Sequence, residues 1–248
     1  MQRSVLEAYL DRYLDVGRFR DYCPNGLQVK GRESVARLVS GVTASVQFLE
    51  AAIDARADAV LVHHGYFWRG EDARVIGPRR RRIALLIEHD LNLLAFHLPL
   101  DAHEEVGNNA ALARELDFSV SGRFGEQDIG MHGEISEAVT LGELAAHVEK
   151  RLQRKPLVVG DVSRPVRRVA WCTGAAQGYV EDAARLGVDV YLTGEISEQT
   201  VHFARESGIG FISAGHHATE RYGVQSLGAH LADRFALDHR FIDVDNPV

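Results

Sequence analysis

The stretch AVLVHHG, from Ala59 to Gly65, is a short apolar run that ends in two histidines and a glycine. A run of this length, with β-branched side chains and a closing glycine, is typical of a buried strand. Open α/β sheets bind their ligands at the carboxyl ends of such strands, and neutral imidazole is the commonest metal ligand. The stretch therefore predicts an α/β sheet with His63 and His64 as candidate ligands. Taken alone, the pair is also compatible with one core and one surface histidine.

The elements around this stretch follow the order strand, helix, strand. Residues 38–42 predict a strand, and the apolar side chains from Phe48 to Ile53 recur at helical spacing. This order is the βαβ pattern of a parallel sheet. A third predicted strand, Leu93–Phe96, leads into His97, with Asp101 four residues later. Two neighbouring strands thus end at histidines.

Two helix starts carry the signature of a capping box, a hydroxyl residue followed three positions later by glutamate. The first is Ser4 with Glu7, and the second is Thr140 with Glu143. A helix is therefore predicted to begin at each of these sites.

The chain also contains an internal repeat. A shift of 131 residues places residues 38–43 on residues 169–174 and the pair His63-His64 on Gly194-Glu195. Beyond that point the second half is shorter, and the alignment then places two more residues as follows: His97 on His216 and Asp101 on Glu220. The identities are few, but the order of elements agrees. The repeat predicts two related α/β domains packed around a shared metal-binding cleft.

The boundary between the two domains is predicted where the hydrophobic pattern lapses, between Gly122 and Asp128. The expected domains are residues 1–125 and 126–248, and C-terminal elements are allowed to pack back on the first domain. The sequence thus predicts two related domains of similar length.

Composition excludes several classes of function. The formal net charge of −7 disfavours a nucleic-acid-coating surface, and no apolar run is long enough to cross a membrane. The two cysteines are far apart in sequence and give no disulfide framework, which favours a cytoplasmic location. The basic block Arg79–Arg82 is interpreted as a solvated helix face and not as a phosphate-binding patch.

The candidate ligands share one feature, since each lies just beyond a predicted strand. They are His63, His64, His97, Asp101, His216 and Glu220. His216 and Glu220 are one helical turn apart and face the same way. Mixed imidazole and carboxylate donors suit Zn²⁺, Fe²⁺ or Mn²⁺ better than Ca²⁺ or Mg²⁺. The donors outnumber the needs of one tetrahedral ion, so two ions bridged by a carboxylate and a water are expected.

Three of the candidate residues keep alternative interpretations. Asp101 is either a ligand or the cap of the turn that follows it. His97 is either close to the metals or a core histidine bonded to a backbone carbonyl. Glu195, at the repeat position of His64, is either a proton shuttle that faces the metals or a structural hydrogen-bond partner. Trp68, Tyr66 and Arg221 are candidates for holding a substrate.

Five motifs together resemble a known family. They are YCPNGLQV (residues 22–29), VHHGYFW (62–68), HLPLD (97–101), TGE (193–195) and GHHATE (215–220). The chain resembles the Nif-three-like dinuclear metal-binding family in its short, YbgI-type form, which is often labelled GTP cyclohydrolase 1 type 2. The resemblance covers essentially the whole chain.

The resemblance implies two α/β domains and a dinuclear site. It implies the following metal ligands: His63, His64, Asp101, His216 and Glu220, the last touching both ions. It also implies a ring-shaped homohexamer. The label would mean attack of metal-bound hydroxide on C8 of GTP, although nothing in this sequence recognises guanine.

Two functions follow from these observations. The first is a metal-dependent hydrolase that acts on a small nucleotide-like substrate, with Glu195 and His97 as candidate catalytic residues. The alternative is a non-enzymatic protein that stores or inserts iron or another transition metal. A hydrolase needs an open coordination position and a substrate pocket, whereas a metal handler needs exchangeable metal and a partner surface.

Overall fold

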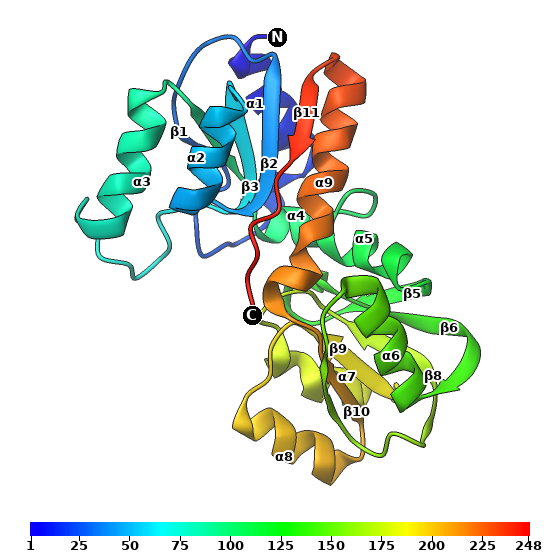
Figure 1. Cartoon of the computed structure of the whole chain (residues 1–248). Helices are drawn as coiled ribbons and strands as arrows, with labels where there is room; N and C mark the ends of the chain where they lie inside the picture. Colours follow the sequence, from blue (N-terminus) through cyan, green and yellow to red (C-terminus); the bar gives the residue numbers. More distant parts are fainter. The chain divides into compact units, whose positions relative to one another are not determined.

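A computed structural model describes all residues, 1–248, and they form two compact units. Unit 1 comprises residues 1–107 and 223–245, and unit 2 comprises residues 108–222 and 246–248. Each unit contains one sheet with helices packed on it (Figure 1). The predicted α/β class with two related α/β domains is confirmed. The boundary predicted at residue 125 lies inside unit 2, because β5 (Phe118–Phe124) pairs with β6 (Gly130–Thr140).

Unit 1 is built around a five-stranded sheet of order β1-β4-β3-β2-β11. Its elements before residue 107 are α1 (Arg3–Tyr13), β1 (Gly26–Val29), β2 (Arg37–Thr43), α2 (Val46–Asp54), β3 (Ala59–His64), α3 (Gly77–Glu88), β4 (Asn92–Ala95) and α4 (Leu98–Ala102), with a short 3₁₀ turn at Val16–Arg18. Strands β2, β3 and β4 are parallel, and β1 is antiparallel to β4. The last strand, β11 (Asp238–Phe241), adds in parallel to β2, so the C-terminal segment packs on the first sheet.

The two faces of the first sheet are covered by different helices because strand side chains alternate. Leu38 and Leu61 pack with the apolar face of α1 and with the second half of α9 (His216–Phe235). Val39 and Val60 pack on the other face with Phe48 of α2, and α3 adds Leu86 there. A parallel sheet covered on both faces reads as a nearly continuous apolar run, which is the pattern of β3.

Unit 2 is built around a six-stranded sheet of order β5-β6-β8-β9-β10-β7. Its other elements are α5 (Asn108–Glu115), α6 (Leu141–Leu152), β7 (Leu157–Val159), β8 (Pro165–Trp171), α7 (Val180–Arg185), β9 (Val190–Thr193), α8 (Glu198–Ser207), β10 (Gly210–Ser213) and the start of α9, with 3₁₀ turns at Glu126–Asp128 and Gln177–Tyr179. The run β7-β10-β9-β8 repeats the order β1-β4-β3-β2 of unit 1.

The two predicted capping boxes have different outcomes. Thr140 Oγ1 accepts from the Glu143 backbone, and the Glu143 carboxylate accepts from the Thr140 backbone, so the box of α6 is confirmed. The box predicted at Ser4 is wrong. Helix α1 already begins at Arg3, and the Glu7 carboxylate accepts a hydrogen bond from the Arg3 guanidinium. Glu7 therefore forms an ion pair within α1 and does not take part in a capping box.

The basic block Arg79–Arg82 lies in α3, as predicted. Two of its guanidinium groups pair with carboxylates of the same unit, Arg79 with Glu71 and Arg81 with Glu50. No helix of the structure is long and apolar enough to cross a membrane.

Candidate metal centre

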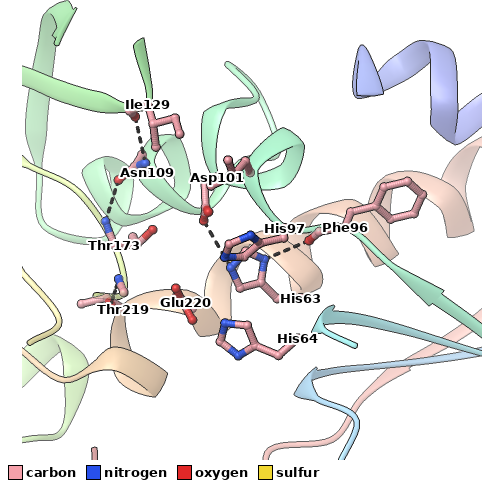
Figure 2. A network of polar contacts seen from close by, with 12 residues as sticks. His63, His64, Phe96, His97, Asp101, Asn109, Ile129, Thr173, Thr219 and Glu220 are labelled. Carbon is pink, nitrogen blue, oxygen red and sulfur yellow. Dashed lines mark hydrogen bonds and ion pairs between the residues drawn. The ribbon is translucent and has the colours of Figure 1, made fainter. Parts of the chain in front are cut away.

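In unit 1, β3 delivers two imidazoles to the carboxyl end of the sheet. His63 is fully buried, and its Nδ1 lies 2.9 Å from the carbonyl oxygen of Phe96 (Figure 2). His64 Nδ1 lies 3.1 Å from the Thr43 hydroxyl. The ring centroids of the two histidines are 4.6 Å apart. Although side chains alternate along a strand, these two rings therefore lie side by side where β3 ends.

The neighbouring strand β4 leads into the other two unit 1 candidates. His97 precedes α4, and Asp101 lies in the first turn of that short helix and is buried. Asp101 Oδ1 is 3.4 Å from His63 Nε2. One ring nitrogen from each of His63, His64 and His97 lies within 4.8 Å of the others. Unit 1 alone therefore brings together three imidazoles, with a carboxylate beside His63.

In unit 2, the helix α9 begins at His216, directly after β10 and Gly215. His216 Nδ1 is 2.7 Å from Glu195 Oε1, and its Nε2 is 3.1 Å from Glu220 Oε2. Burial alone would lower the pKa of His216, but Glu220 and then Glu195 raise it to about 9 through hydrogen bonds and charge. The imidazole is thus held between two carboxylates.

Two glycines make room for this arrangement. A Cβ on Gly174 would lie 2.1 Å from Glu220 Oε1, and φ of +69° at Gly174 is a conformation that favours glycine. A Cβ on Gly194 would lie 2.7 Å from Cα of His216. The hydroxyl of the buried Thr219 accepts from the Gly174 N–H and donates to the His216 carbonyl, which fixes the first turn of α9.

The donors fit a transition-metal ion. Three of the imidazoles have Nδ1 beside an oxygen that can only accept, so Nδ1 carries the proton; these partners are the Phe96 carbonyl for His63, Asp21 for His97 and Glu195 for His216. Histidines that bind metal through Nε2 are oriented in this way. Two ligands about 2.1 Å from one tetrahedral ion lie roughly 3.4 Å apart, and the His63–Asp101 and His216–Glu220 separations are similar.

The charge of the unit 2 cluster also fits a cation. Without a metal, Glu195 and Glu220 hold a proton on His216, which is why its pKa is raised. A divalent ion on His216 Nε2 and Glu220 would supply that positive charge in place of the proton.

The repeat alignment of the second ligand pair was wrong by one residue. The register β3–β4 pairs Ala59 with Asn92, and the register β9–β10 pairs Val190 with Gly210. The backbone bond from Asp101 N to His97 O is matched by that from Thr219 N to Gly215 O. His97 therefore corresponds to Gly215 and Asp101 to Thr219. Sequence alone could not place the deletion, because the loops on either side of α3 and α8 have no periodicity and the two connections differ in length.

Several residues near the site behave differently from the sequence expectation. The Tyr66 ring is buried, and its hydroxyl donates to the Ala44 carbonyl. Arg221 donates to the Leu152 carbonyl. Trp68 lies with its ring centroid 5.0 Å from that of His97 and 5.9 Å from that of His64. Of the three candidates for substrate contact, Trp68 is the one beside the unit 1 imidazoles.

Sequence reasoning missed Asp21, the residue that holds His97. Its carboxylate lies 2.7 Å from His97 Nδ1. The only sequence signal was its position just before the turn PNG at residues 24–26, and that pattern indicates a turn and nothing about a partner 76 residues away.

These features define a class of protein: two α/β repeats that carry histidine and carboxylate clusters able to bind metal at strand ends. The sequence matches the family Duf34/NIF3 (NGG1p interacting factor 3) over residues 1–247. The chain belongs to this family, as its motifs predicted.

Relatives and solved structures agree with this assignment. A protein of Pseudomonas aeruginosa named "GTP cyclohydrolase 1 type 2 homolog" is 58% identical over 247 residues, 98% of both chains. The solved structure of protein ybgI, described as of unknown function, has a TM-score of 0.97 and 48% identity, and covers both chains completely. The crystal structure of TTHA1606 from Thermus thermophilus has a TM-score of 0.92 and 35% identity, again over both whole chains.

Proposed function

We propose that the protein binds two divalent transition-metal ions and uses them to hydrolyse a small nucleotide-like substrate. The residues that would hold the ions are His63, His64, Asp101, His216 and Glu220, and the family resemblance implies that Glu220 would contact both. The observation that carries the proposal is the common orientation of the imidazoles. Nδ1 lies beside an oxygen of the same unit in His63, His64 and His216, and this orientation supports Nε2 as the ligand atom of each.

The chemistry of the donors restricts the ions. Imidazole and carboxylate without thiolate suit Zn²⁺, Fe²⁺ and Mn²⁺. A bound pair of such ions lowers the pKa of a coordinated water and stabilises negative charge on a substrate oxygen. The curated relatives carry the name of a GTP cyclohydrolase homolog, which supports a nucleotide-like substrate.

Besides the proposed metal ligands, the chain supplies residues that orient a ligand or face the site. Glu195 holds Nδ1 of His216, and this contact supports a role in orienting that ligand. Exchange of protons with a substrate stays the alternative role of Glu195. His97 lies beside the His63 and His64 rings without being a proposed ligand, and we assign it to contact with water or substrate.

The test is elemental analysis of protein purified without chelator or affinity tag. We expect about two transition ions per chain in the wild type. His64→Ala tests the unit 1 ligands, and Glu220→Gln tests the unit 2 ligands, and each should lose at least one ion. The exposed residues His89 and Glu198 offer matched controls, because His89→Ala and Glu198→Gln should keep full occupancy. Full occupancy in both ligand variants would contradict the ligand assignment.

A second measurement separates a hydrolase from a metal handler. Protein loaded in turn with Zn²⁺, Mn²⁺ and Fe²⁺ is assayed for turnover of nucleoside triphosphates, including GTP. A hydrolase turns over a substrate with at least one metal and loses that activity in Glu220→Gln. A metal handler shows no turnover with any metal but gives up its ions to a competing chelator.

The family resemblance also supports a cytoplasmic homohexamer with the sites facing an internal cavity. Light scattering on the purified protein tests the oligomer, and a monomer or dimer at micromolar concentration would contradict it.

A further inference from the structure

The segment before β1 binds His97 through a buried carboxylate. The Asp21 side chain is only 4% exposed. It accepts four hydrogen bonds, from Tyr22 N (2.6 Å), His97 Nδ1 (2.7 Å), Asn25 Nδ2 (2.8 Å) and Leu98 N (2.9 Å). Asn25 Oδ1 in turn accepts from His97 N at 2.7 Å. Both the ring and the backbone of His97 are therefore held by one short loop.

This contact decides which nitrogen of His97 carries the proton. Burial alone would raise the pKa of Asp21, but the hydrogen bond and charge of His97, with the bonds from Asn25 and Leu98, lower it to about 2. The carboxylate is therefore ionised near neutral pH and can only accept. His97 Nδ1 must donate to it, so in the neutral ring Nε2 carries the lone pair.

The surroundings of Asp21 argue against a third metal site in this corner. Cys23, Asp21 and His97 place potential ligand atoms within 4.8 Å of one another. Burial, together with the charges of Asp21 and Asp101, raises the pKa of Cys23 to about 12, so the thiol stays protonated. The Asp21 oxygens are engaged by four N–H donors, and His97 Nδ1 is one of them.

The ring of His97 lies next to the proposed ligands of unit 1. Its centroid is 5.0 Å from that of His63 and 5.9 Å from that of His64, and the Trp68 ring meets it edge-on at 5.0 Å. The arrangement of a buried carboxylate, an imidazole and a reactive site follows the logic of catalytic triads, in which the acid fixes the tautomer of the histidine.

We propose that Asp21 is a positioning residue that fixes His97 as the Nδ1–H tautomer, so that Nε2 accepts a hydrogen bond from a water or a substrate N–H or O–H group beside the metal ligands. The proposal rests on the proposed function for what His97 contacts. The tautomer itself is a property of unit 1 that exists without metal or substrate.

The test is long-range ¹H–¹⁵N NMR of the metal-free, histidine-labelled full chain near pH 7.5. In the wild type we expect His97 to show a protonated Nδ1 and an unprotonated Nε2. In Asp21→Ala, Nδ1 has lost its acceptor, and we expect the ratio of the two tautomers to fall at least about tenfold, because a charge-assisted hydrogen bond favours one form by more than that factor. A wild-type His97 protonated on Nε2, or an unchanged ratio in Asp21→Ala, would overturn the proposal.

Two further variants keep the test decisive. Asn25→Ala loosens the same loop and leaves the carboxylate on Nδ1, so the tautomer should not change. A shift as large as that of Asp21→Ala would mean that loop order, and not the carboxylate, sets the tautomer. If Asp21→Ala does not fold, Asp21→Asn takes its place, because the amide has the same shape as the carboxylate. In that variant we expect the Nδ1 proton to exchange with solvent at least about tenfold faster, since the bond is no longer charge-assisted, and an unchanged exchange rate would count against the proposal.

The outcomes also separate this inference from the proposed function. Loss of metal from the ligand variants with an unaltered His97 tautomer in Asp21→Ala would leave the metal centre standing and remove the role of Asp21. If the protein binds no metal but the tautomer of His97 is fixed and depends on Asp21, the role of Asp21 stands and the metal centre is contradicted.

Discussion

The two repeats share a backbone frame but differ in chemistry at the strand ends. Asp58 of unit 1 accepts hydrogen bonds from the backbone N–H groups of Ala36 and Arg37. Asp189 of unit 2, 131 residues later, accepts the same pair of bonds from Arg167 and Arg168. The agreement extends to the arginines at equivalent positions. Arg37 donates to the carbonyls of residues 55 and 56, and Arg168 donates to those of residues 186 and 187.

None of the unit 1 site residues recurs in unit 2 at the equivalent place. The sheet registers and helix starts give these pairs: His63 with Gly194, His64 with Glu195, His97 with Gly215, and Asp101 with Thr219. The proposed unit 2 ligands, His216 and Glu220, lie one position further along. One residue in a helix turns a side chain by about 100°, so the second repeat presents its donors from a different face of its helix.

The comparison teaches that the scaffold and the site are conserved to different degrees between the repeats. Backbone hydrogen bonds at the start of β2 and β8 hold the frame, and small residues in unit 2 give space to α9. Unit 2 has Gly194 at the position of His63. The backbone of His216 occupies the space that a side chain at Gly194 would need.

The largest effect is expected from filling that space. Gly194→Ala places a Cβ 2.6 Å from the Gly174 carbonyl oxygen and 2.9 Å from the backbone N of His216. These are backbone atoms that cannot rotate away, so we expect a loss of about 3 kcal/mol in the free energy of unfolding and displacement of His216. Denaturant unfolding and metal content measure the two effects.

Gly178→Ala is the matched control for this variant, because nothing lies within 4 Å of a Cβ at Gly178. It should change stability by less than about 1 kcal/mol. Equal stability of the two variants would mean that the two repeats tolerate the same side chains at the strand end.

An intermediate effect is expected from the shared aspartates. Burial alone would raise the pKa of Asp58, but bonds from the backbone of Arg37 and Ala36 and from Arg32 lower it below 3.8. The folded state then binds this proton less readily than the unfolded chain, so the stabilisation is present above about pH 4 and is lost as pH falls through the lowered pKa. We expect Asp58→Asn to cost about 2 kcal/mol at pH 7.

Urea unfolding of Asp58→Asn at pH 7 and at pH 3 checks the sign. The difference from the wild type should shrink at the lower pH. Asp189→Asn sharpens the comparison, since Asp189 has the two backbone donors while Asp58 also binds Arg32. The variant in unit 1 should therefore cost more, and a larger cost in unit 2 would break the assignment of the extra bond.

The smallest effect is expected at the helix that precedes the first strand of each repeat. Thr140→Ala removes the capping box of α6 and should cost about 1 kcal/mol. Ser4→Ala in the corresponding helix α1 should be neutral, because Ser4 does not cap that helix. Thermal unfolding of both variants tests this difference, and equal shifts in melting temperature would contradict it.

Much of the fold could be predicted from local patterns. The strands β2, β3 and β7 and the helix α2 follow from apolar runs and spacing, and the predicted βαβ order is present in both units. The strand β5 was missed because its exposed residues, such as Val120, give no alternating pattern. It is held by pairing with β6. A strand leaves no alternating pattern in the sequence when neither of its faces is buried.

The sequence by itself determined the α/β class and the positions where histidines and carboxylates follow strands, because these depend on neighbours within a few residues. It also determined the repeat at 131 residues, because both halves contain the same order of such local patterns. The tertiary structure alone decided the remaining features. It set the registers of β4 and β10, which make His97 equivalent to Gly215 in the alignment of the two repeats. It also placed Asp21 beside His97 and Glu195 beside His216. These contacts form between segments distant in the chain, and their hydrogen bonds depend on how the sheets pair and not on local spacing.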